Sequence, residues 1–82
     1  MADRSALAFL NAEFHTGMAM SRVALLARSQ EKKERNRANA RKAYDSILHY
    51  LPGSHLTARE ANDFETKLEE LRAILKSLGE VI

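Results

Sequence analysis

The fold is decided by the stretch LTAREANDFETKLEELRAILKSLG, residues 56–79, which contains the start, the apolar stripe and the end of one helix. Thr57 and Glu60 form a capping box, in which each side chain accepts a hydrogen bond from the other residue's backbone N–H. Gly79 can take the left-handed conformation that ends a helix. Between them, apolar residues recur at steps of three and four and predict a stripe that other helices must cover: Ala61, Phe64, Leu68, Leu71, Leu75 and Leu78.

Two further helical patterns precede this stretch. The second of them ends at Pro52-Gly53, a pair that breaks helices. Between the first and the second there is neither proline nor glycine from Ser29 to Asn39. A single helix from Ser5 to Leu51 would nevertheless be about 70 Å long, which one domain of this size could not cover. We therefore expect a turn near Ser29 to Glu31.

The sequence thus predicts an all-α protein, a compact antiparallel three-helix bundle with helices over about 4–29, 32–51 and 57–78 in a single domain over 1–82. Gly17 lies inside the first helix, where glycine costs about 1 kcal/mol relative to alanine. Either a neighbouring helix approaches closely beside Gly17, Ser21 and Ala24, or the glycine is simply tolerated. The residues expected to pack the helices together are Leu10, Phe14, Met18, Leu25, Tyr44, Ile47, Leu48, Leu51, Phe64, Leu68, Leu71, Leu75 and Leu78.

Composition narrows the class of protein. The chain has 82 residues, and a domain of this size buries only about 60% of its unfolded surface, so we expect a second copy or another helical protein to cover leftover apolar surface. The absence of cysteine excludes disulfides and thiolate metal sites and favours the cytoplasm. Asn11 and Glu13 interrupt the apolar start before a signal-peptide core is reached. No apolar run approaches the roughly 20 residues of a membrane span.

Charge is distributed unevenly along the chain. Residues 22–42 contain eight basic and two acidic residues, a net charge of +6, whereas residues 57–82 carry a net charge of −2. Such a segment can bind phosphates with salt-dependent affinity, or an acidic protein surface. The stronger interpretation is a solvated surface, because its charges surround the helix and no aromatic residue interleaves with them to stack a base. The candidate contacts are Arg28, Lys32, Lys33, Arg35, Arg37, Arg41 and Lys42.

Signals for catalysis, metal binding and cofactors are missing. His49 and His55 are six residues apart across the Pro52-Gly53 turn and could approach each other, but two histidines with no placed carboxylate are a poor metal site. Each of the three histidines, His15, His49 and His55, is expected at the surface or its boundary. The serines lack a nucleophile elbow, and no glycine-rich loop precedes a helix to bind phosphate. We therefore expect a protein that is not an enzyme and holds no cofactor.

Two partial resemblances add to this interpretation. The segment from Ala40 through Tyr44 to Pro52 resembles the second helix of a tetratricopeptide repeat, but Ala24, Ala27 and Arg28 stand where the first repeat helix would need large apolar residues and a Leu-Gly pair. More broadly, residues 35–45 and the leucine-rich helix that starts at Leu56-Thr57 resemble small bacterial helical proteins of unassigned function. That resemblance implies a compact helical protein and no activity.

The chain is therefore interpreted as a protein–protein interaction or structural module that associates with itself as a homodimer or with another helical protein. The alternative is a small nucleic-acid-binding protein that uses the basic segment 28–42 on phosphates.

Overall fold

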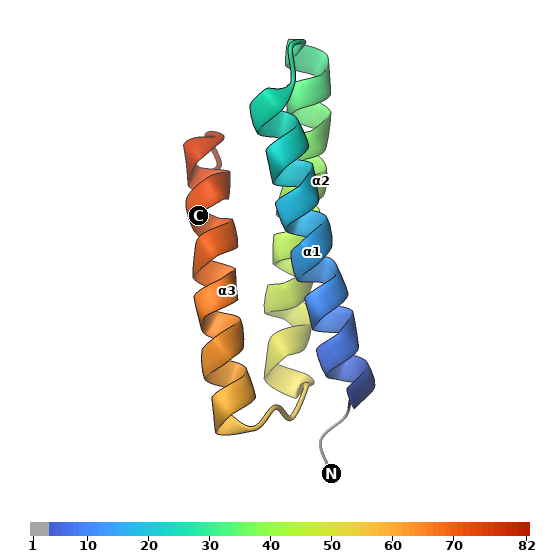
Figure 1. Cartoon of the computed structure of the whole chain (residues 1–82), viewed down its shortest axis with the longest axis vertical. Helices are drawn as coiled ribbons and strands as arrows, with labels where there is room; N and C mark the ends of the chain where they lie inside the picture. The colour runs from blue at the N-terminus through green and yellow to red at the C-terminus, as the bar shows by residue number, and fades with distance from the viewer. Residues whose placement is uncertain (1–3) are drawn as a thin grey trace.

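The computed structural model describes residues 4–82, which form α1 (Arg4–Leu26), α2 (Gln30–Tyr50), a short 3-10 turn η1 (Leu51–Gly53) and α3 (Ala58–Ser77). α1 and α3 run in one direction and α2 in the other, side by side (Figure 1). The predicted all-α three-helix bundle is confirmed, and every predicted helix end lies within three residues of the observed one. In this part of the chain, no helix combines the length and the apolar character needed to cross a membrane.

Side-chain caps set two of the helix starts. The hydroxyl of Ser29 accepts from the backbone N–H of Lys32, so α2 starts directly after Ser29 and the turn lies slightly earlier than the sequence indicates. At α3 the predicted capping box is present: Thr57 N–H donates to Glu60 Oε1 at 2.9 Å, and Glu60 N–H donates to Thr57 Oγ1 at 3.1 Å. Gly79 follows α3 with φ 101°, the left-handed conformation expected of it.

α1 and α2 pack more closely with each other than either does with α3, because small residues line their contact. Gly17, Ser21 and Ala24 of α1 are buried, as are Ala40 and Ala43 of α2. A Cβ atom on Gly17 would lie 2.9 Å from Leu71 Cδ2 and 3.5 Å from Ala43 Cβ. Of the two readings of Gly17, the close approach is therefore the correct one.

The core lies between the three helices. Phe14 of α1 and Phe64 of α3 meet edge to face with ring centroids 6.4 Å apart, and the fully buried Leu71 of α3 packs against Gly17. Lys67 covers the two rings, with Nζ 5.7 and 5.8 Å from their centroids, and donates to Asn11 Oδ1 at 3.0 Å. The buried cluster comprises Leu10, Phe14, Ala40, Tyr44, Ile47, Phe64, Leu71 and Leu75.

Two of the residues predicted to pack the helices together, Leu25 and Leu48, are exposed, so the prediction is wrong for them. Leu25 is 50% exposed because it lies at the end of α1, where the α1–α2 pair extends past the end of α3 (Figure 1). Leu48 is 46% exposed because the neighbouring Ile47 points into the core, and each step along a helix rotates the side chain by about 100°. Leu78 is buried, whereas Met18, Leu51 and Leu68 are partly buried against the core.

The bundle is elongated, with extents of 46 × 19 × 17 Å. α3 covers one side of the α1–α2 pair and ends before it reaches the tip of that pair, which we define as the end of α1, the connection 27–29 and the start of α2 (Figure 1). The tip and the opposite side of the pair are therefore not covered by the described chain.

Candidate interaction surfaces

The seven predicted basic contact residues do not form one continuous surface. Lys32 and Lys42 line hollows between α1 and α2, and Arg28 borders the hollow at the tip. Lys42 also borders a second hollow, which Arg37 and Arg41 line together with three carboxylates. Lys33 is half-buried and Arg35 is exposed. Arg37 and Arg41 lie on the edge of α2 that faces the chain after α3, where both are already paired.

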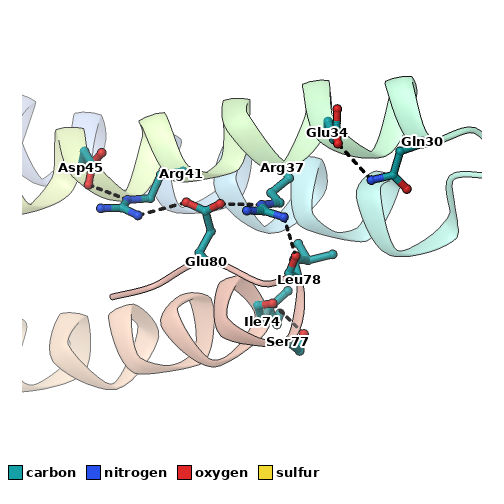
Figure 2. Close-up of polar contacts among 9 residues, drawn as sticks. All are labelled: Gln30, Glu34, Arg37, Arg41, Asp45, Ile74, Ser77, Leu78 and Glu80. Atoms are coloured by element: carbon teal, nitrogen blue, oxygen red, sulfur yellow. Dashed lines mark hydrogen bonds and ion pairs between the residues drawn. The ribbon is translucent and has the colours of Figure 1, made fainter.

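Glu80 sits between Arg37 and Arg41 and binds both (Figure 2). Arg37 Nε donates to one carboxylate oxygen of Glu80, and Arg41 Nη1 donates to the other at 3.0 Å. Arg41 Nε also donates to Asp45 Oδ1 at 3.0 Å, while Arg37 Nη1 donates to the backbone carbonyl of Leu78 at 3.0 Å. This ion-pair clamp fastens the residues after α3 to the middle of α2.

The clamp shifts the ionisation of its members. The hydrogen bond from Arg37 lowers the pKa of Glu80 below its ordinary value; partial burial opposes this shift and Arg41 reinforces it. The hydrogen bond to Asp45, followed by the one to Glu80, raises the pKa of Arg41. Glu80 is thus a carboxylate at neutral pH, and it occupies two of the seven cations proposed for an external acidic partner.

The clamp was not predicted from the sequence. Arg37 and Arg41 stand four apart on one edge of α2, which is a usable signal for a shared anion. Their partner, however, is 43 and 39 residues away in the chain. Only the turn at Gly79 brings Glu80 back towards α2, and the sequence indicated that turn as a helix end rather than as a reversal.

A line of hollows runs between α1 and α2, and only residues of these helices and their connections line it. On α1 the lining residues recur at steps of four and three, which defines one stripe along the helix. The antiparallel α2 supplies the opposite wall. We call this line the outer groove; its main residues are Phe9, Glu13, Thr16, Met20, Val23 and Leu26 of α1 with Lys32, Asn39, Lys42, Ser46 and Tyr50 of α2.

Large apolar side chains are exposed at both ends of the outer groove. Leu26 is 82% exposed at the tip, with Val23 beside it. At the other end Tyr50 is 54% exposed and its ring meets that of Phe9 edge to face, with centroids 5.2 Å apart. Met20 is partly buried near the middle. The groove therefore presents exposed apolar side chains at its two ends, while mainly polar residues line its middle beside Met20.

The charge lining the outer groove is mainly positive. Arg28 and Lys32 border the tip hollow and Lys42 the middle one, whereas Glu13 is the acidic residue among the lining side chains of the described chain. None of these four takes part in an ion pair with another residue of the described range. They are available to a charged partner.

The histidines form no metal site among residues 4–82. His15, His49 and His55 are all exposed, as expected, and no group of three or more potential metal ligands occurs in this range. His49 contacts the ring of Tyr50 at a centroid distance of 4.7 Å, at the end of the outer groove.

No protein-family model matches the chain, and neither a curated protein nor a solved structure is significantly similar to it.

Proposed function

We propose that this protein is a protein–protein interaction module rather than an enzyme, and that the outer groove is the surface through which it binds. The observation that carries this proposal is the alignment of exposed apolar side chains along one groove: Phe9 and Tyr50 at one end, Val23 and Leu26 at the other. Single exposed apolar residues are ordinary, but two clusters of them aligned along one groove and rimmed by polar residues are typical of a binding surface. The cysteine-free composition supports a role in a reducing compartment such as the cytoplasm.

A second copy is one possible partner, and charge decides against placing two outer grooves face to face. Each groove would bring Arg28, Lys32 and Lys42 to the contact, against a single carboxylate from Glu13. Like charges opposed across an interface cost affinity, whereas opposite charges raise the association rate and select the partner. The groove therefore favours an acidic protein surface over its own image.

Nucleic acid remains the alternative function, supported by the net charge of +6 between Arg22 and Lys42. Phosphates would be bound by the cations that the clamp leaves free, and the affinity would fall steeply with salt. Two observations argue against this alternative. Arg37 and Arg41 are paired with Glu80, and Arg28 and Lys32 line the tip hollow, away from these two arginines.

The test is affinity capture of the tagged chain from its own cells, in nuclease-treated and untreated halves. The variant Val23→Asp/Leu26→Asp places two carboxylates in the groove, and Thr66→Asp/Ala73→Asp places two on the exposed side of α3 as a matched control. We expect the wild type and the control to retain the same protein after nuclease and the groove variant to lose it. Retention that is identical for all three chains, or that disappears with nuclease, would refute the proposal.

Sedimentation of the purified chain over a range of concentrations separates self-association from binding of another protein. A dimer that dissociates in the groove variant but not in the control would identify the second copy as the partner through this same surface. A dimer that is unchanged in both variants would place the contact elsewhere on the bundle.

A further inference from the structure

We propose that the outer groove binds an acidic amphipathic α-helix, seated lengthwise between α1 and α2 as the fourth helix of the bundle. This inference rests on the proposed function and specifies the chemistry of the partner. Three properties of the groove carry it: its length, its apolar residues and its charge.

The length of the groove fits a helix of ordinary size. From Phe9 to Leu26 the groove follows α1 for 17 residues, or about 26 Å at 1.5 Å per residue. The hollows along it lie between two antiparallel helices, which is the position that an additional helix occupies in a four-helix bundle. A concave line of this length fits a helix better than it fits a flat lipid surface, although a basic and apolar surface would attract both.

The apolar residues define the face that the partner must present. Val23 and Leu26 lie at the tip, Met20 near the middle, and Phe9 with Tyr50 at the far end. A helix laid along this line contacts them with one stripe of its own, so its apolar residues recur at steps of three and four. The aromatic pair is the largest exposed contact and forms the natural anchor.

The charge defines the flanks of the partner. Arg28, Lys32 and Lys42 come from the tip and from α2, and these three cations line the groove. Arg35 and Glu31 lie seven and eleven residues before Lys42 on the same side of α2 and offset each other in charge. Glu13, on the α1 wall, is the only carboxylate among the lining residues of the described chain. An apolar stripe flanked by Asp or Glu therefore matches the groove, whereas one flanked by Lys or Arg is repelled by it.

The experiment uses the whole chain and three labelled synthetic peptides of about 18 residues, which span about 27 Å as helices. The first has a leucine stripe flanked by glutamate, the second the same stripe flanked by lysine, and the third the glutamate flanks with the leucines replaced by glutamine. Binding is measured by fluorescence anisotropy in moderate salt. We expect the first peptide to bind at least about ten-fold more tightly than either of the others.

Charge-reversed variants locate the binding. Lys32→Glu/Lys42→Glu reverses the charge at two positions of the outer groove. Arg59→Glu/Lys76→Glu makes the same change in net charge at two exposed positions of α3. We expect the groove variant to lose at least about ten-fold in affinity for the glutamate-flanked peptide and to gain affinity for the lysine-flanked one, and the α3 variant to resemble the wild type. Far-UV circular dichroism of each variant checks that the bundle stays folded.

Several results would overturn the inference. These are equal binding of the glutamate-flanked and lysine-flanked peptides, equal losses in both charge-reversed variants, and no binding of any peptide. Binding to phosphatidylserine vesicles that exceeds peptide binding and depends on Lys32 and Lys42 would assign the groove to a membrane instead. If the peptides fail while protein capture still depends on Val23 and Leu26, only the helical chemistry of the partner is wrong and the proposed function stands.

Discussion

Gly17 provides the sharpest test of the packing, because two opposing effects meet at one atom. Gly17→Ala gains about 1 kcal/mol of helix propensity. The added Cβ, however, would lie 2.9 Å from Leu71 Cδ2 and 3.2 Å from Leu71 Cδ1, inside a core where Leu71 is fully buried and cannot move into solvent. Overpacking of a filled core costs about 1–3 kcal/mol. We therefore expect Gly17→Ala to destabilise the protein by up to about 2 kcal/mol.

The sign should reverse when Leu71 is shortened. Leu71→Ala alone should lower the free energy of unfolding by about 2–5 kcal/mol, because it leaves a cavity next to Gly17. In that background the alanine methyl group at position 17 enters the cavity, so Gly17→Ala recovers its helix propensity together with about 0.8 kcal/mol for the newly buried methyl group. The same substitution should then stabilise the variant by about 1–2 kcal/mol.

Urea denaturation of the four chains, followed by circular dichroism at 222 nm, measures this coupling. In thermal unfolding of the same four chains, a difference of 1 kcal/mol in stability corresponds to a shift of roughly 4–8 °C in the melting temperature of a domain of this size. If Gly17→Ala stabilises the wild type, or changes both backgrounds by the same amount, Leu71 does not limit the space at Gly17 and the packing described above is wrong.

Three further predictions concern single side chains. Ser21 has a fully buried hydroxyl with no hydrogen-bond partner among the described residues, so Ser21→Ala should raise the free energy of unfolding by about 1 kcal/mol in urea titrations, and a loss of stability would mean that the hydroxyl is satisfied. Thr57→Ala removes the hydroxyl of the capping box and should cost about 1 kcal/mol, while an unchanged urea midpoint would show that α3 does not depend on its cap. Because the pKa of Glu80 is lowered in the folded state, chiefly by Arg37, the clamp should stabilise the protein fully above the ordinary pKa of glutamate and lose that effect as the pH falls through the lowered value. Glu80→Gln should therefore flatten the acid limb of a melting-temperature profile, and an identical limb in both chains would show that the clamp contributes nothing.

Local signals in the sequence were sufficient for the helices. The capping box at Thr57, the break at Pro52 and the left-handed Gly79 each depend on residues within one turn of each other, and all three are present. The turn before α2 was placed slightly late because Ser29 was taken for a residue of the turn rather than for the N-cap. A stripe at steps of three and four predicts which face of a helix is buried, and this gave most of the core.

Contacts that depend on where helices end were not predictable. Leu25 continues the stripe of Phe14 and Met18, and periodicity alone cannot say that α3 ends before reaching it. The outer groove was missed for a related reason: Phe9 and Val23 are not among the residues predicted to pack the helices together, and they lie on a different side of α1 that no helix of the described chain covers. The basic segment was correctly recognised as spread around the helix, but the pairing of Arg37 and Arg41 with Glu80 depends on the tertiary fold.

The hydrogen bond from Arg37 to the Leu78 carbonyl joins the secondary structure of α3 to its docking. The last carbonyls of a helix carry the negative end of its macrodipole, and a cation there is stabilising. Here that cation comes from α2, so α3 gains it only when it lies in its place in the bundle. Undocking α3 would therefore also weaken its own last turn, and this coupling favours cooperative, all-or-none unfolding over the gradual fraying of a loosely attached helix.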